Sequence, residues 1–383
     1  MTAPVFSSPR TAITIVFVTF GIAIGALAGS MPSVMRNSGI DAETFGLGLT
    51  LSTVLTVAAM SVGGQIARVA SNRAVLLAVL PSFALSLGAY LTAASPVWFF
   101  ITIPIMGLCF GLTDLFMNAE AVALEHDLKR PIFMTFHGGV SAGVGVMAVV
   151  ASWLSTQWGT WAVAMVAAVM FTVSWVFVYQ AIAPRPLAVG RAARIGTLPN
   201  KTPLMLLGIA AGLIIAAETA ALLWSAKLLD EIAPSLAAIA GLGAAFFGVC
   251  NAAVRFPGDR MRSLLGEMPL MFGSLVVSIC GFVALGLSSS FVVSVTAFAS
   301  VGFGLALLIP TIFAMSARLV PENRAGALSF VSLLTAVPRI MAPLAFGMVA
   351  ARLGIAFSFG LVAVGLLASL GLILTFKRKG HGI

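Results

Sequence analysis

Seven polar or charged residues interrupt stretches of sequence that are otherwise apolar: Asp114, Asn118, Glu120, His137, Glu218, Asn251 and Arg339. A charged side chain at the centre of a membrane helix costs about 2.5–3.5 kcal/mol on insertion scales, so such residues persist mainly where they face water or a partner. Carboxyl and imidazole groups can load and release protons, while amide and guanidinium groups can bind a polar solute. The sequence has no His-Glu-x-x-His motif, cysteine cluster or Gly-x-x-x-x-Gly-Lys-Ser/Thr loop, so it indicates no metal, no cofactor and no use of ATP.

The composition is that of a membrane protein. Of the 383 residues, 60% are hydrophobic and only 9% are charged, whereas soluble proteins carry about 25% charged residues. A soluble fold would leave too much of this apolar surface in water. The net charge of +9, from 21 Lys and Arg minus 12 Asp and Glu, therefore indicates basic cytoplasmic loops rather than a nucleic-acid partner.

Twelve apolar stretches approach or exceed the length of about 20 residues that a membrane-spanning helix needs. Six precede and six follow a central stretch with three prolines and four basic residues. We therefore expect an all-α integral membrane protein with two six-helix bundles, at residues 1–184 and 202–383, and a cytoplasmic linker at 185–201. The expected spans are residues 11–35, 44–67, 74–95, 98–125, 131–154, 159–183, 202–227, 234–255, 267–288, 291–317, 324–351 and 354–376.

The basic residues predict which side of the membrane each loop faces. Seventeen of the 21 Lys and Arg residues lie at the chain ends or near alternate loops, whereas Arg36, Lys227 and Arg352 lie near the other loops and Arg339 lies within a span. Cytoplasmic loops carry the excess of Lys and Arg. Both termini should therefore be cytoplasmic, in a bacterial inner membrane.

Two of the basic loops are similar to each other. The loop after the second span reads Gly63-Gly64-Gln65-Ile66-Ala67-Arg68, and the loop after the eighth reads Arg255-Phe256-Pro257-Gly258-Asp259-Arg260. With these loops and its six-plus-six layout, the whole chain resembles the major facilitator superfamily. Members of that family carry a Gly-x-x-x-Asp-Arg signature in the loop after the second span, often repeated after the eighth. The first copy has Ala67 in place of the Asp, and the second has Arg255 in place of the Gly.

The resemblance implies two bundles that rock about a site near the membrane midplane. It also implies a cytoplasmic gate, in which Asp259 and neighbouring arginines latch the two bundles together and hold an outward-open state. The alternative is that these loop charges only fix the topology. The candidate gate residues are Arg68, Arg73, Arg255, Asp259 and Arg260.

The fourth expected span carries the best candidate for a proton site. Asp114 and Asn118 are four residues apart, so they share a helix face, and Asp114 lies near the middle of the span. A carboxyl group there could carry a proton as access alternates, or it could form a structural hydrogen bond. The segment Gly107–Glu120 resembles the fucose-permease-like branch of the superfamily, whose fourth span has a proton-coupling acid followed four residues later by Asn. Unlike fucose permeases, this chain has no acid in its first expected span.

Three further residues are candidates for proton coupling: Glu120, His137 and Glu218. Glu120 faces away from Asp114 on the same helix, and it could instead pair structurally with His137. Glu218 and Arg339 each lie about sixteen residues from the cytoplasmic end of their spans, so they should form a pair or share a water-filled cavity.

The expected substrate contacts are Asn118, Asn251 and Arg339, although Arg339 could instead serve in a structural salt bridge. Three other acids are near the cytoplasmic ends of spans, and we expect them to be solvated: Glu125, Asp127 and Glu267.

Together these residues predict a secondary transporter rather than an enzyme. We expect coupling to protons and a small polar solute, of the sugar or cyclitol type, with the chain working as a monomer among membrane lipids. Two alternatives remain: an exporter of amphipathic compounds, whose cavity the 27 Phe and 17 Met could line, and a non-transporting membrane sensor on the same fold.

The orientation can be tested by labelling. In a background without Cys109, Cys250 and Cys280, a single cysteine at position 194 should react with an impermeant thiol reagent only from the cytoplasmic side, because the loop charges place it there. Labelling of this position in intact cells would contradict the orientation.

Overall fold

The computed structural model describes residues 8–129, 132–184, 198 and 201–378, apart from the side chains of Met134 and Asp259. Most of the expected linker lies outside the described residues. The described part of the first half consists of six helices, α1 (Pro9–Ser38), α2 (Ala42–Val69), α3 (Asn72–Leu91), α4 (Pro96–Leu128), α5 (Phe133–Gln157) and α6 (Thr160–Ala181).

The second half is less regular. Its described elements are α7 (Thr202–Ile232), η3 (Pro234–Ile239), α8 (Leu242–Arg255), α9 (Gly258–Leu265), α10 (Glu267–Leu287), α11 (Phe291–Leu305), α12 (Leu308–Leu319), η4 (Pro321–Asn323), α13 (Arg324–Leu353) and α14 (Ile355–Phe376). No β-strand occurs in the described residues, so the prediction of an all-α membrane protein is confirmed.

Small polar residues begin several helices of the first half. The side chains of Ser8, Asp41, Ser71 and Ser95 each accept a hydrogen bond from the backbone N–H three residues further on, which satisfies a donor at the helix start. At Asp41, hydrogen bonds from Thr44 hold the pKa of the carboxyl below its usual value.

Two expected spans differ from continuous helices. Eleven described helical segments are long and apolar enough to cross a membrane, and α8 adds a shorter apolar helix of 14 residues. The span expected at 234–255 is thus divided into η3 and α8. The span expected at 291–317 breaks between α11 and α12, because Pro310 has no N–H to donate to the carbonyl of Ala306 four residues earlier.

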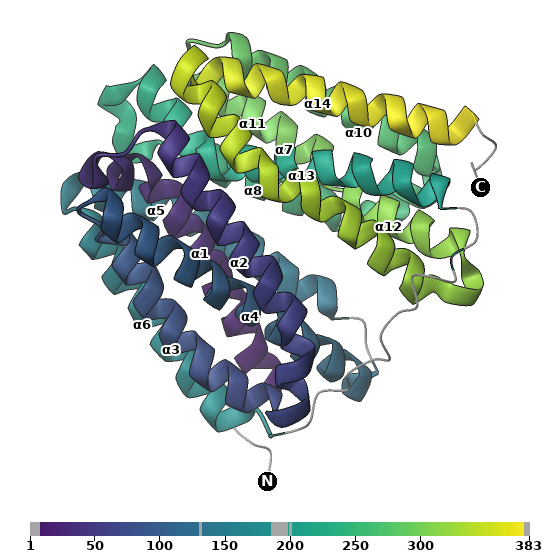
Figure 1. The fold of residues 1–383 in the computed structure, drawn as a ribbon, viewed down its shortest axis with the longest axis horizontal. Coiled ribbons are helices and arrows are strands. Elements are labelled where there is room, and N and C mark those ends of the chain that lie inside the picture. The colour runs from purple at the N-terminus through teal and green to yellow at the C-terminus, as the bar shows by residue number, and fades with distance from the viewer. Residues whose placement is uncertain (1–7, 130–131, 185–197, 199–200, 379–383) are drawn as a thin grey trace.

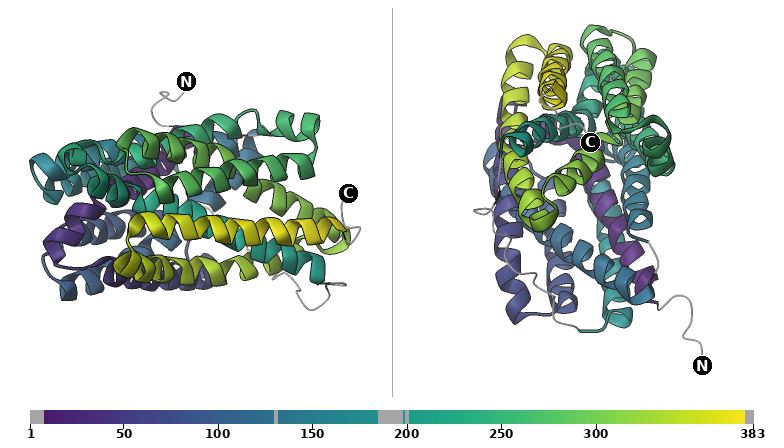
Figure 2. Two further views of the ribbon diagram at one scale, coloured as in Figure 1. Left: turned by 90° about the horizontal axis from the view of Figure 1, so that it is seen from above. Right: turned by 90° about the vertical axis from the view of Figure 1, so that its right-hand side faces the viewer.

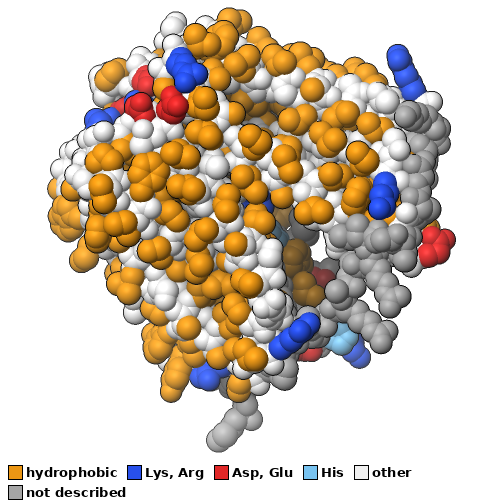
Figure 3. All heavy atoms as spheres, viewed as in Figure 1, with side chains coloured by type: hydrophobic (Ala, Val, Ile, Leu, Met, Phe, Trp, Pro, Cys, Tyr) orange, Lys and Arg blue, Asp and Glu red, His pale blue; other side chains and the backbone are white. Residues whose placement is uncertain are grey.

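The two halves form two bundles that meet at an angle (Figures 1 and 2). α1 packs along α5 and α2 along α4 in the first bundle, while α7 packs along α13 and α14 in the second. Between the bundles, α2 packs against α13 and α5 against α8. Figure 3 shows a mainly hydrophobic surface that is hollowed between the two halves.

The bundles touch most closely at one end, which we call the closed face; it carries the turns at 39–41, 92–95, 157–159, 232–241 and 353–354. Here the backbone N–H of Gly241 donates to Ser152 Oγ at 2.9 Å, and Arg36 forms an ion pair with Asp230 at 2.7 Å. By the charge distribution, the opposite, open face is the expected cytoplasmic side. Asp259 is expected to latch the cytoplasmic face when that face is closed, whereas here the expected cytoplasmic face is open. The latch therefore stays a prediction.

An aromatic group fills the space between the bundles on the closed-face side. Trp224 of α7 is 1% exposed and contacts Phe45 of α2, with ring centroids 5.5 Å apart, and Phe346 of α13 at 4.8 Å. Burial of such large rings excludes water. These three side chains therefore seal the closed face from within.

Glycines allow α2 and α13 to approach each other backbone to backbone. A Cβ added at Gly46 would lie 2.5 Å from the carbonyl oxygen of Pro343 and 3.1 Å from Cα of Gly347, and one added at Gly347 would lie 2.3 Å from the carbonyl oxygen of Ala42. Because the obstructing atoms are backbone, a larger side chain requires the helices to separate.

We therefore expect Gly46→Leu to open the closed face. Overpacking of this kind costs about 1–3 kcal/mol, which corresponds to a shift of about 5- to 150-fold between two arrangements. Spin labels at positions 94 and 289, which are exposed turn residues of opposite bundles, should show a longer distance. Gly371→Leu is the control, because no atom lies within 4 Å of a Cβ at that position. Equal distances in both variants would contradict the prediction.

Candidate functional site

A cavity of about 240 Å³ lies between the two bundles. Helices α1, α2 and α4 form one wall, and α7 and α13 form the other. A solute in this cavity would contact both bundles at once. Its lining residues are Ile24, Leu27, Leu49, Ser52, Thr53, Thr56, Met106, Phe110, Glu218, Thr219, Leu222, Leu223, Arg339 and Pro343.

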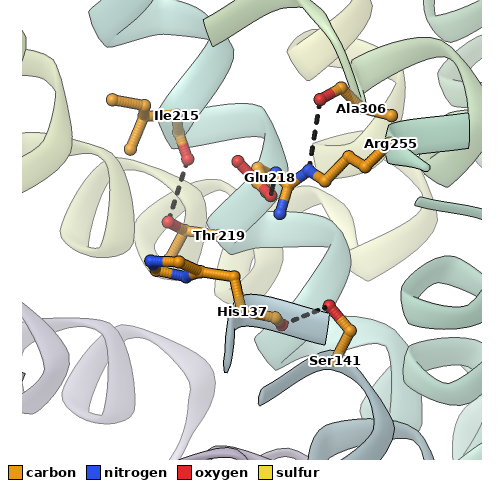
Figure 4. Close-up of polar contacts among 7 residues, drawn as sticks. All are labelled: His137, Ser141, Ile215, Glu218, Thr219, Arg255 and Ala306. Atoms are coloured by element: carbon orange, nitrogen blue, oxygen red, sulfur yellow. Dashed lines mark hydrogen bonds and ion pairs between the residues drawn. The ribbon is translucent and has the colours of Figure 1, made fainter. Parts of the chain in front are cut away.

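The carboxylate of Glu218 is paired with Arg255. Arg255 Nη2 lies 3.4 Å from Glu218 Oε1, and Arg255 Nε donates to the carbonyl oxygen of Ala306 at 3.2 Å (Figure 4). The Ala306 carbonyl is available because of the break that Pro310 causes between α11 and α12. This contact therefore joins α7, α8 and the broken tenth span.

Arg339 shares the cavity with Glu218 but does not pair with it. Among the described side chains, Arg339 forms no ion pair within 4 Å, and Asp114 of the other bundle lies about one helical turn from Phe110, which lines the same cavity. Of the two arrangements expected for Glu218 and Arg339, the structure has the shared cavity, and the close partner of Glu218 is Arg255.

Asp114 and Asn118 are in direct contact along one face of α4. Asn118 Nδ2 donates to Asp114 Oδ1 and to the Asp114 carbonyl oxygen, both at 2.8 Å. Asn118 Oδ1 is buried and has no hydrogen-bond donor among the described residues. The pair is half-buried, and neither residue is among those that line the central cavity.

Glu120 occupies a different environment on α4. It is 1% exposed and accepts a hydrogen bond from Asn72 of α3 at 2.8 Å. Both residues belong to the first bundle, and neither lines the central cavity. This contact fits a structural role, although coupling through Glu120 stays a prediction.

His137 lies in a second cavity of about 250 Å³ between α5 and the α8–α9–α12 region. Its ring packs against Phe17 and Phe133, at centroid distances of 5.3 and 4.8 Å. Arg255 lines the same cavity and acts electrostatically on His137. Arg255 therefore connects the two cavities, because it also holds Glu218.

The other predicted residues are spread out. Asn251 is buried in α8, and its Nδ2 has no acceptor among the described residues. Arg68 and Arg260 are exposed, whereas Arg73 donates to the carbonyl oxygen of Tyr179 at 2.8 Å on the α3–α6 side of the first bundle. The side chain of Asp259 lies outside the described residues, so the gate as a whole stays a prediction.

Two acids expected to be solvated have structural partners. Glu125 Oε2 accepts from the backbone N–H groups of Ile132 and Phe133, at 2.8 and 2.7 Å, and so caps the start of α5. Glu267 pairs with Arg262 at 2.7 Å and also with Arg318. Sequence spacing alone could not reveal these partners.

A serine motif in α5 is not a catalytic site. Residues 139–143 read Gly-x-Ser-x-Gly, which in hydrolases forms a strand-to-helix turn that exposes the serine. Here the segment lies within the continuous helix α5, and Ser141 Oγ donates to the carbonyl oxygen of His137 at 3.3 Å. The local geometry therefore differs from that of a nucleophile elbow.

Comparisons with known proteins agree with a transport fold. No protein-family model matches the chain. An uncharacterized MFS-type transporter of Yersinia pestis is 26% identical over 376 residues, which cover 94% of each chain. The membrane protein MosC of Rhizobium meliloti is 25% identical over 393 residues, covering 99% of this chain and 94% of MosC.

Solved structures share the whole fold at low sequence identity. The nucleoside transporter NupG matches with a TM-score of 0.74 and 14% identity, over 97% of this chain and 98% of NupG. The D-xylose–proton symporter matches with a TM-score of 0.74 and 15% identity, over 94% of this chain and 95% of the symporter. The chain thus has the major facilitator fold and is a distant homologue of MFS-type transporters.

The contact between Glu218 and Arg255 can be measured by a double-mutant cycle. Each side chain is 27% exposed, so removing one partner leaves a partly buried charge. We expect Glu218→Gln and Arg255→Gln each to lower the stability to unfolding in detergent, with a coupling free energy of about 0.5–3 kcal/mol between them. The i,i+4 pair of Lys227 and Glu231, at 3.0 Å and with the Glu231 side chain 47% exposed, should give only about 0.3–0.5 kcal/mol. Strictly additive effects at Glu218 and Arg255 would contradict their coupling.

Proposed function

We propose that this protein is a secondary active transporter that moves a small polar solute across a bacterial inner membrane by alternating access, coupled to protons. The observation that carries the proposal is the cavity between two bundles that are closed on one face only. The fold provides two bundles able to rock about such a cavity. The expected orientation makes the present arrangement open to the cytoplasm.

The proposed coupling rests on two acid–arginine relationships around the cavity. Glu218 is held by Arg255 within the second bundle, and Asp114 lies about one helical turn from Phe110, which lines the cavity together with Arg339 of the other bundle. Protonation of either acid removes the attraction and releases its arginine, and an unpaired charge in this environment is costly. Proton binding would thereby change both the charge of the cavity and the contact between the bundles.

Asp114 is the proposed site of the transported proton, with Glu218, Glu120 and His137 as further candidates. Asp114 lies near the middle of α4 (Pro96–Leu128) and is bonded to Asn118. This arrangement supports the proposed place among the fucose-permease-like transporters, in which an acid in the fourth span precedes an Asn by four residues.

The proposed solute is small and polar, of the sugar or cyclitol type. Thr53, Thr56 and Thr219 donate their hydroxyl hydrogens to backbone carbonyls, so the main donor for the solute would be Arg339, which lines the cavity. An acceptor would come from Glu218, which also lines the cavity. Transport of nucleosides and of D-xylose by proteins of the same fold supports this solute class.

An exporter of amphipathic compounds is the second candidate. Eight of the fourteen residues that line the central cavity are apolar. A further, largely apolar crevice of about 280 Å³ lies between α7, α13 and α14, and it shares Thr219 and Pro343 with the central cavity. An apolar part of a solute could therefore pack beside the charged groups.

A ligand screen separates these two candidates. Thermal unfolding of the purified protein should shift with monosaccharides, cyclitols or nucleosides, because a ligand at 100 times its Kd stabilises the native state by about 2.7 kcal/mol. Shifts produced only by amphipathic cations or detergents would favour the exporter instead.

Coupling is tested by Asp114→Asn. The amide still forms hydrogen bonds but does not titrate, so accumulation of a ligand identified in the screen should fall to passive equilibration under a pH gradient. Exchange of labelled for unlabelled ligand needs no net proton movement and should partly survive. Both are measured in proteoliposomes.

Glu218→Gln is the matched variant from the other bundle, where we expect a weaker loss of accumulation and an altered KM. An Asp114→Asn protein that still concentrates the ligand in response to a pH gradient would place the coupling elsewhere. Glu120 with His137 would be examined first, and then Glu218.

A further inference from the structure

The hydroxyl of Thr50 in α2, a helix of the first bundle, lies beside a pair of backbone groups in α13 of the second bundle. In a regular helix, the backbone N–H of Leu344 donates to the carbonyl of Ile340, four residues earlier. Thr50 Oγ1 of α2 contacts both groups: it accepts from the Leu344 N–H at 3.1 Å and donates to the Ile340 carbonyl oxygen at 3.1 Å. Thr50 therefore bridges the donor and the acceptor of one helical hydrogen bond of α13.

The preceding backbone hydrogen bond of α13, from residue 343 to residue 339, cannot form. Pro343 has no N–H, so the carbonyl of Arg339 receives no helical hydrogen bond from it. Insertion of a side chain and an internal proline are both recognised causes of helix bending. The turn from Arg339 to Leu344 consequently lacks one helical hydrogen bond, at Pro343, and forms two hydrogen bonds with Thr50 of the other bundle.

This turn also belongs to the candidate transport site. Arg339 and Pro343 both line the central cavity, and the Pro343 carbonyl oxygen is the nearest atom to a Cβ added at Gly46 of α2. A change in the contact between α2 and α13 therefore acts directly on the turn that presents Arg339.

We propose that Thr50 is a positioning residue that forms its two hydrogen bonds with α13 only while the closed face is closed. Through these bonds it couples closure of that face to the placement of Arg339. With the bundles together, the hydroxyl holds the Ile340 carbonyl and the Leu344 N–H. When the bundles part on that face, Thr50 withdraws, the two groups bond to each other, and the turn that carries Arg339 tightens. The inference rests on the alternating access proposed above.

The test compares Thr50→Val, which removes the hydroxyl at nearly constant volume, with Thr50→Ser, which keeps it. The readouts are spin-label distances in the full chain lacking its three cysteines, between positions 94 and 289 on the closed face and between 126 and 264 on the open face. All four positions are exposed and each pair spans the two bundles. Thr172→Val is the control, because Thr172 donates only to its own helix, at the Ala168 carbonyl, on α6.

We expect Thr50→Val to increase the population with a long 94–289 distance by about two- to tenfold, the effect of losing one hydrogen-bonded contact. The 126–264 distance should shorten in the same population. Thr50→Ser and Thr172→Val should resemble the parent.

A parent-like distance distribution in a folded Thr50→Val protein would overturn the proposal. An equal shift in Thr50→Ser would also overturn it, because the methyl group rather than the hydroxyl would then be responsible. Gly46→Leu distinguishes this failure from that of the proposed function: if it lengthens the 94–289 distance while Thr50→Val does not, only the role of Thr50 is lost. If neither variant changes any distance, alternating access itself is contradicted.

Discussion

The arrangement of the candidate site depends on keeping the Glu218 carboxylate paired within the membrane. Neither Glu218 nor Arg255 can be left unpaired cheaply at this depth. The pairing requires Arg255 to lie at the end of α8, and it uses the Ala306 carbonyl as a second acceptor. That carbonyl is available only because Pro310 interrupts the tenth span. One proline, one arginine and one acid on three different spans are thus parts of a single electrostatic arrangement.

The closed face follows a different physical rule. Contact there depends on backbone approach at Gly46 and Gly347 and on a few hydrogen bonds, with Trp224 and its aromatic neighbours filling the space behind. Small residues let membrane helices pack closely without strong polar interactions. Helices in such a contact fit together closely, yet separating them costs only a moderate amount of free energy. Two bundles that rock against each other require a contact of this kind.

Most of the fold can be predicted from the sequence, because it depends on properties that can be counted along the chain. Apolar length locates the spans, and the even division around the basic centre predicts two bundles. Depth is also readable, because each helical residue advances about 1.5 Å, and Glu218 and Arg339 do share a cavity. The short α8 and the break before α12 were not predicted, although Pro310 is a visible signal for the break.

Partners were harder to predict than depth, because a partner depends on the rotation of each helix and on which bundle faces which. Arg255 was assigned to a loop gate from its place in a motif, yet its long side chain also reaches Glu218. Glu267 was expected in water and pairs with two arginines from other elements. The role of Thr50 has no sequence signal, since its contacts lie about 290 residues away and belong to backbone groups.

The balance of charge around the cavity links the two proposed activities, proton binding and solute binding. The acids Asp114 and Glu218 are matched in number by the cations Arg339 and Arg255, so the group as a whole is neutral when both acids are ionised. A proton on either acid leaves one positive charge in excess, in surroundings where an uncompensated charge is unfavourable. Electron-rich oxygens of a bound solute can offset that excess by accepting from the released guanidinium. Proton and solute would then each stabilise the binding of the other, as the thermodynamics of linked sites requires.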